Sequence, residues 1–144
     1  MKWWNRWEVL ALGSAFFASL TAILGKIGVA NINSNLATFI RTGVVLILTA
    51  FLLFYLNQWQ SPGTIGAKTW IFLALSGLAT GLSWLCYYRA LQLGLVSKVA
   101  SLDKLSVALA VLLGVIFLGE KLSWPVALGA GLITMGAILI ALFS

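Results

Sequence analysis

Few residues in this 144-residue chain could carry out acid–base or metal chemistry. It contains three Asp and Glu, nine Lys and Arg, and no His. His is the commonest general base and metal ligand, so both roles lack their usual residue. The one cysteine, Cys86, cannot form an intrachain disulfide or build a zinc site. With no paired carboxylates and no thiol–base pair, the sequence argues against an enzyme, and we expect no metal or other cofactor.

Five charged residues fall within or at the ends of long apolar stretches. Counting about 1.5 Å per residue, Lys26 and Arg89 lie near stretch ends, Arg41 lies roughly 7 Å inside, and Asp103 and Lys104 lie about 10–12 Å inside. All five occupy the same half of the membrane depth. Ionisable groups there are costly and indicate function by default. One acid among four cations predicts binding of an anionic or zwitterionic substrate, or proton exchange at Asp103.

Structural explanations compete with this functional one. Lys26 and Arg89 could reach the lipid headgroups with their long side chains. Arg41 and Asp103 are too deep for that, and we expect them to form an ion pair between helices that fixes their register. Lys104, next to Asp103, is expected to point about 100° away around the helix.

A second group of residues shares one face of the third apolar stretch. Gly77, Gly81, Trp84 and Tyr88 follow three- and four-residue spacing, and Tyr87 flanks them. The Gly77–Gly81 pair permits close approach of another helix. The aromatic residues could form one wall of a substrate pocket, because their polar tips need partners, or they could serve ordinary packing.

The elements that must position these residues are membrane spans. The chain is 62% hydrophobic and 8% charged, with mean hydropathy +1.07, whereas a soluble domain has about 25% charged residues. This composition excludes a soluble globule, a disordered chain and a nucleic-acid module. Five stretches reach the length of about 20 residues that a span needs. They are residues 7–29, 36–56, 69–91, 96–118 and 124–143. The prediction is an all-α bundle of five transmembrane helices, forming one domain over residues 1–144.

Short connections separate the spans. An Asn or Ser in residues 30–35 is expected to cap the second helix, and Gly94 to end the third. Pro62-Gly63 marks the only long loop, at residues 57–68, and Pro125 suits the first turn of the last helix.

Positive charges are nearly balanced between the two membrane sides. An odd number of spans puts the termini on opposite sides, called side A at the N-terminus and side B. Side A holds Lys2, Arg6, Lys68 and Lys121, while side B holds Lys26, Arg41, Arg89, Lys98 and the deeper Lys104. The positive-inside rule needs a clear excess, so weak orientation and dual topology are predicted. If the cations buried within the spans serve a function and are left out of this count, side A has the excess of positive charge and is cytoplasmic. Trp3, Trp4 and Trp7 are expected at the membrane interface.

Several strings together resemble the EamA family of the drug/metabolite transporter superfamily, in particular its single-unit members of about 140 residues. They are ATFIRT (37–42), SGLATGLSWLCYYRALQLG (76–94), SKVASLDKLSV (97–107) and LGEKLSW (118–124). Tyr87, Tyr88, Arg89 and Gly94 match the family pattern after the third span, and Glu120 matches the glutamate of its LGE string. Many relatives carry a proline near the start of the fourth span, where this chain has Asp103-Lys104 instead.

The resemblance implies a transporter of small metabolites in the cell inner (plasma) membrane. Many relatives carry two five-helix units in inverted orientation, so this chain would need a partner: a second, antiparallel copy or a different half-size protein. The substrate is expected to be a small polar metabolite, amino-acid-like or anionic. Glu120 is assigned a structural role beside the N-terminus of the fifth helix. The alternative function is a non-transporting membrane assembly subunit or half of a heterodimeric transporter. The expected partners are lipid, a small-molecule substrate and a second copy, and we expect neither nucleic acid nor nucleotide.

Overall fold

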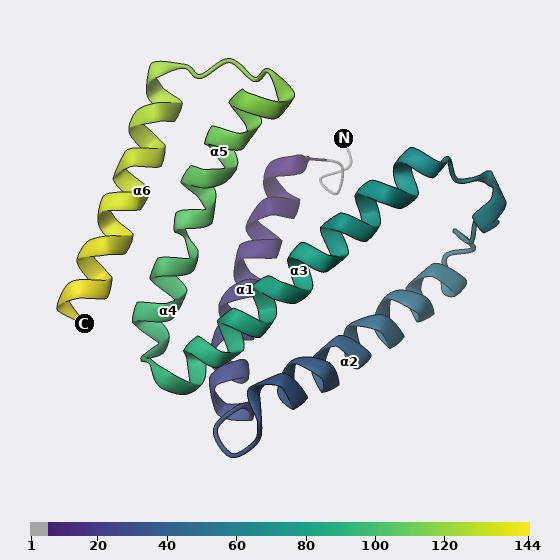
Figure 1. Ribbon diagram of the computed structural model, residues 1–144, viewed down its shortest axis with the longest axis horizontal. Coiled ribbons are helices and arrows are strands. Elements are labelled where there is room, and N and C mark those ends of the chain that lie inside the picture. The colour runs from purple at the N-terminus through teal and green to yellow at the C-terminus, as the bar shows by residue number, and fades with distance from the viewer. Residues whose placement is uncertain (1–5) are drawn as a thin grey trace. The chain divides into compact units, whose positions relative to one another are not determined.

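The computed structural model describes residues 6–144, which form six α-helices and one 3-10 turn (Figure 1). They are α1 (Trp7–Gly28), α2 (Ser34–Tyr55), η2 (Pro62–Thr64), α3 (Ala67–Leu93), α4 (Val96–Asp103), α5 (Leu105–Leu118) and α6 (Trp124–Phe143). Helices α4 and α5 together make one apolar stretch, so five stretches are long and apolar enough to cross a membrane. The predicted all-α, five-span fold class is confirmed. The expectations for Lys2, Trp3 and Trp4 lie outside the described residues.

The helix ends follow the local signals of the sequence. Asn33 is the N-cap of α2, and its Oδ1 accepts a hydrogen bond of 2.8 Å from the amide of Asn35. Helix α3 ends at Leu93, just before Gly94, and Pro125 lies in the first turn of α6. Gly119 ends α5 with φ of +68°, a left-handed conformation that glycine adopts without steric cost.

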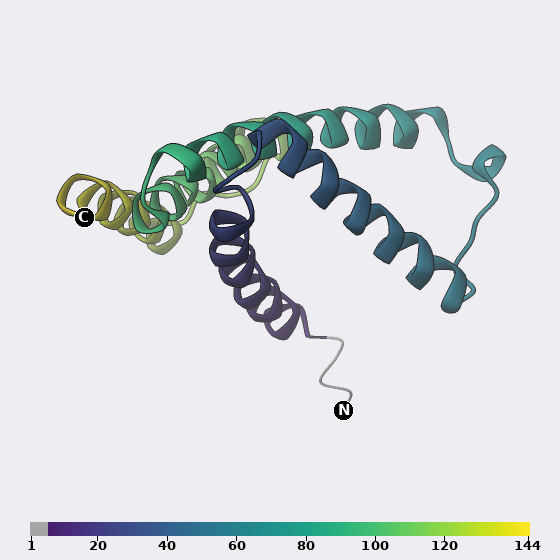
Figure 2. The ribbon, with the colours of Figure 1, turned by 90° about the horizontal axis from the view of Figure 1, so that it is seen from below.

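The described residues divide into two compact units, one of residues 6–26 with 93–144 and the other of residues 27–92. In the first unit, α4 and α5 both pack against α6, the yellow helix of Figure 1. In the second unit, α2 and α3 run in opposite directions on either side of the η2 loop, and Figure 2 shows them diverging toward that loop. The prediction of one domain over residues 1–144 stays a prediction.

Apolar side chains cover the outside of the helices. Phe39 is 75% exposed and Phe117 is 77% exposed, and most other large apolar residues of the spans are exposed as well. Water-soluble monomers rarely present continuous apolar surfaces of this kind. Lipid tails are the solvent that fits them, which agrees with five membrane-spanning stretches.

The fourth span is interrupted at Lys104, between α4 and α5. The amide of Lys104 donates to the carbonyl of Ser101, and the amide of Val107 donates to the carbonyl of Lys104, both over 3.0 Å. Each bond spans three residues, so a 3-10 turn replaces α-helical geometry here. The sequence predicted an uninterrupted helix, because no Pro or Gly stands at this point. The turn needs neither, since Lys104 stays in the right-handed region with φ −70° and ψ −10°.

Candidate functional site

The guanidinium of Arg41 lies on the aromatic face predicted for α3. Its Cζ atom is 3.9 Å from the ring centroid of Trp84 and 5.5 Å from that of Tyr88. Both distances fall within the range of a cation–π interaction. Arg41 and Trp84 are half-buried, and Tyr88 is buried. The structure therefore brings together three of the residues that the sequence singled out.

Helix periodicity and small residues explain this contact. Trp84 and Tyr88 are four residues apart, so their side chains follow one another on one face of α3. On α2, the buried Ala37 and Thr38 precede Arg41 by about one turn. The Thr38 hydroxyl donates to its own helix, at the carbonyl of Ser34 over 2.9 Å, so burying it leaves no unpaired polar group.

Arg41 has no acid within its unit, because residues 27–92 contain neither Asp nor Glu. A guanidinium carries five N–H donors in one plane and no acceptor. The ring of Trp84 supplies no acceptor for these donors, and a carboxylate can accept two of them side by side. The arrangement can therefore bind a carboxylate or another planar anion through paired hydrogen bonds.

Tyr87 lies beside this cluster rather than in it. Its ring meets the ring of Tyr88 edge-on, with 6.3 Å between centroids and 61° between planes. Tyr87 is half-buried, and it flanks the aromatic face as the spacing of the sequence indicates. An edge-on pair of this kind holds the Tyr88 ring in place.

Gln92 is a site residue that the sequence reasoning missed. Its Oε1 accepts from Nη1 of Arg89 over 2.9 Å, and its Nε2 donates to the carbonyls of Val29 and Ile32 over 3.0 and 2.6 Å. Gln92 thereby ties the turn before α2 to the end of α3 and positions the exposed Arg89. The signal that could have found it is the three-residue spacing of Arg89 and Gln92, which places them together on a helix.

Lys26 binds a backbone carbonyl. Its Nζ donates to the carbonyl of Gly94 over 2.8 Å, and the residue is half-buried. This carbonyl follows the last residue of α3, where backbone acceptors lack helical donors. A cation at a helix C-terminus also interacts favourably with the helix dipole.

Asp103 pairs with its neighbour Lys104 at the interruption of the fourth span. The distance from Lys104 Nζ to Asp103 Oδ2 is 3.5 Å, and the two side chains are 55% and 40% exposed. The sequence predicted that Lys104 points away, but the side chains nevertheless meet across the 3-10 turn. Arg41 and Asp103 belong to different units, so the ion pair predicted between them stays a prediction.

The glycine face of α3 is open. A Cβ atom built on Gly77 or Gly81 would have no described atom within 4 Å, apart from the helix's own neighbouring backbone. The close helix approach predicted at these residues therefore stays a prediction, and space for it is present.

Glu120 folds back over the end of α5. Its amide donates to the carbonyl of Gly114 over 3.2 Å, and a Cβ atom on Gly114 would come within 2.8 Å of Glu120 Oε2. Gly114 is buried, and its missing side chain leaves the room that the carboxylate occupies. Beside them is an open hollow of about 730 Å³, lined by apolar residues of α5 together with Glu120.

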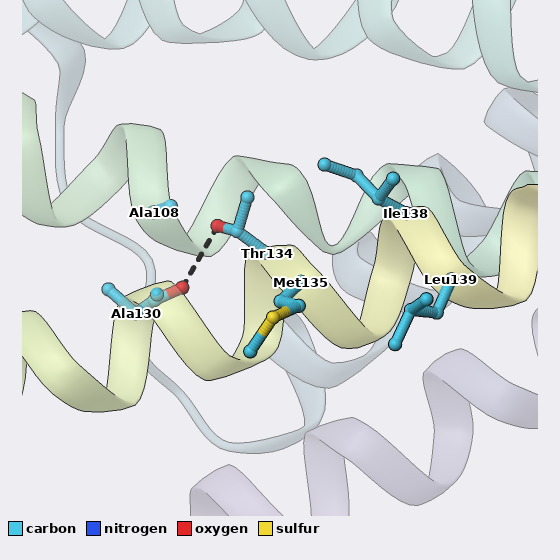
Figure 3. Close-up of a pocket in the computed structure, with 7 residues that line it drawn as sticks. Ala108, Ala130, Thr134, Met135, Ile138 and Leu139 are labelled. Carbon is cyan, nitrogen blue, oxygen red and sulfur yellow. Dashed lines mark hydrogen bonds between the residues drawn. The ribbon is translucent and has the colours of Figure 1, made fainter.

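A second open hollow, of about 450 Å³, lies on α6 (Figure 3). Its lining includes Ala108, Ala130, Thr134 and Met135, with no charged side chain. The Thr134 hydroxyl donates to the carbonyl of Ala130 over 2.9 Å, as the figure shows, so its donor is used within the helix. This hollow suits lipid or helix packing better than a polar substrate.

Five apolar spans define a polytopic membrane protein. Comparison with known proteins gives the family. The model of the EamA-like transporter family matches residues 5–142, so the chain belongs to that family. It is therefore an integral membrane transporter and not an enzyme, and its bacterial relatives imply the plasma membrane.

The chain is similar to two bacterial proteins, and it covers a different share of the length of each. It is 54% identical to an "Uncharacterized transporter in cobO 3'region" of Sinorhizobium sp, over 95% of this chain and 97% of the relative. It is 30% identical to the "Uncharacterized transporter YxxF" of Bacillus subtilis (strain 168), over 90% of this chain but only 40% of the relative. No solved structure matches the chain.

Proposed function

We propose that the protein is a secondary active transporter that moves a small polar metabolite, amino-acid-like or anionic, as an antiparallel homodimer with alternating access. The carboxylate of the substrate binds to Arg41. One observation carries the proposal: Arg41 lies half-buried on Trp84 within a span, in a unit that contains no Asp or Glu. A cation half-buried within a span is energetically costly unless an anion compensates its charge. A transported anion would compensate the charge of Arg41 reversibly.

The aromatic residues support a carboxylate substrate. A guanidinium held against a ring loses less freedom when it binds than a free one, because the contact already restricts its side chain. Trp84 and Tyr88 also offer apolar surface to the remainder of a metabolite. An amino-acid-like molecule fits both features.

Two observations support a homodimer of opposite orientations. The chain spans 40% of the length of its Bacillus relative, as expected for one unit of a transporter built from two. Lys and Arg residues are nearly balanced between the two membrane sides, which favours insertion in both directions. Inverted units related by an axis in the membrane plane are a common basis of alternating access.

Flux through reconstituted protein tests the transport activity. Proteoliposomes are assayed for uptake over a panel of labelled amino acids, carboxylates and neutral metabolites. We expect saturable uptake of at least one carboxylate compound, reduced at least about tenfold by Arg41→Gln. The matched control is Arg6→Gln, which removes an exposed cation that precedes α1 and belongs to no candidate site, and it should keep most of the flux. The proposal fails if no compound is transported by folded protein, or if both variants lose activity equally.

The orientation proposal has its own test. A reporter that distinguishes the two sides of the membrane is fused to the C-terminus, and one cation is added or removed on side A, for example Lys68→Gln. Dual topology is supported if the reporter gives a signal from both sides of the membrane and the ratio of the two signals changes when one charge is changed. A fixed orientation contradicts the antiparallel homodimer.

The second candidate is half of a heterodimeric transporter, or a non-transporting assembly subunit. The open face around Gly77 and Gly81 favours it, because small residues without a described neighbour leave room for another helix. Co-purification of a foreign membrane protein in a fixed ratio, with no self-association, would favour this candidate.

A further inference from the structure

Glu120 is the one acid of the described residues that does not face a cation of its own unit. The chain has three acids. Glu8 lies 3.5 Å from Arg6, and Asp103 lies 3.5 Å from Lys104. Glu120 has no such partner among the described residues of its unit, although Lys121 is adjacent. Its carboxylate is instead directed back over Gly114, beside the apolar hollow on α5.

Arg41 is the complementary case in the other unit. It is a cation within a span with no acid in residues 27–92. Its Cζ atom lies close to the rings of Trp84 and Tyr88, which carry no negative charge to act as a counter-ion. Glu120 and the span cation Arg41 therefore each lack an ion-pair partner among the described residues of their own unit, and they lie on different units.

The two groups lie at matching depths if a second copy is inserted the other way up. By alternation of the spans, α2 begins on side B, and Arg41 is seven residues, or about 10 Å, from its start at Ser34. Helix α5 ends on side A, and Gly114 is four residues, or about 6 Å, from its end at Leu118. In antiparallel copies these two ends meet the same membrane surface. The remaining difference of about 4 Å is within the reach of an arginine side chain.

We propose that Glu120 of a second, antiparallel copy pairs with Arg41 and completes the substrate site. The proposal rests on the antiparallel homodimer proposed above and adds the residue through which the two copies meet. A two-fold axis repeats the contact, so each dimer contains two such pairs. In a parallel dimer the two groups lie near opposite surfaces, more than about 10 Å apart in depth, and cannot pair.

The pair also gives the apolar hollow on α5 a role. A second copy seated against this hollow excludes water from Glu120, and an ion pair is stronger where water is excluded. A substrate carboxylate then takes the place of Glu120 on Arg41. Arg41 is therefore paired with one carboxylate both in the empty site and when an anion is bound.

Charge reversal tests the pair without any transported substrate. Arg41→Glu and Glu120→Arg are made singly and together, and dimer formation is measured by energy transfer between labelled copies diluted in liposomes. Each single variant should weaken association at least about tenfold, and the double variant should recover most of it. The matched control combines Arg41→Glu with Glu8→Arg, which reverses another side-A acid and should give no recovery.

Disulfide trapping provides a second measurement if a reversed charge prevents insertion. Arg41→Cys and Glu120→Cys are placed in separately tagged copies that carry Cys86→Ala, and oxidation should link the two tags. The inference is overturned if the double variant is no better than the single ones, or if dimers form without this crosslink. If uptake depends on Arg41 but the double charge reversal does not restore dimer formation, only the Arg41–Glu120 pair is refuted. If the double reversal restores dimer formation but no compound is transported, only the transport proposal is refuted.

Discussion

The contact between Arg41 and Trp84 makes a quantitative prediction for a double-mutant cycle. Single variants are hard to interpret, because removing Arg41 also removes the cost of a charge within the membrane. The cycle of Arg41→Gln and Trp84→Leu subtracts that cost. With 3.9 Å between Cζ and the ring centroid and both residues half-buried, we expect a coupling of about 1–2 kcal/mol.

The assay is reversible unfolding in mixed micelles, followed by circular dichroism for all four proteins of the cycle. The control cycle replaces Trp84→Leu with Trp124→Leu, which alters a 75% exposed tryptophan of the other unit. We expect coupling below about 0.5 kcal/mol there, as for residues without contact. Equal coupling in the two cycles would refute the cation–π contact, and the proposed orientation of the guanidinium with it.

Three further predictions concern the other polar features. Gly114→Ala should change the stability by no more than about 1 kcal/mol in the same unfolding assay, because the atoms it meets are the end of the exposed, flexible Glu120 side chain and alanine favours a helix over glycine. Asn33→Ala should cost about 1 kcal/mol by removing the cap of α2, whereas Asn31→Ala should cost little. Asp103→Asn should change stability by no more than about 1 kcal/mol, because its pair with Lys104 is exposed, and should abolish stimulation of uptake by an imposed proton gradient.

The spans themselves could be predicted from the sequence because their cause is local. Each span needs only a long run of apolar residues, and each end needs a polar or glycine signal. The last span is observed at residues 124–143 as predicted, and the first three differ by two residues or fewer at each end. Asn33 and Pro125 carry their predicted roles because a cap depends on a few adjacent residues.

The pairing of charged side chains could not be predicted in the same way. Depth along a helix follows from counting residues, but the side chain that a cation meets depends on how neighbouring helices are placed. Counting predicted a pair of Arg41 and Asp103, which stays a prediction, but it did not find the contact of Arg41 with Trp84 or that of Asp103 with Lys104. The 3-10 turn at Lys104 was missed for a related reason, since its backbone angles are open to any residue.

The energy of the Arg41 site indicates why a partner anion is needed. Insertion of an arginine at the centre of a span costs about 2.5–3.5 kcal/mol. Its contacts with Trp84 and Tyr88 return about 1–2 kcal/mol, which leaves about 0.5–2.5 kcal/mol uncompensated. A hydrogen bond to a charged group contributes about 1.5–3 kcal/mol, so one carboxylate closes the difference. A substrate or Glu120 of a second copy can supply that carboxylate with similar energy, and this near-equality is what an exchangeable binding site requires.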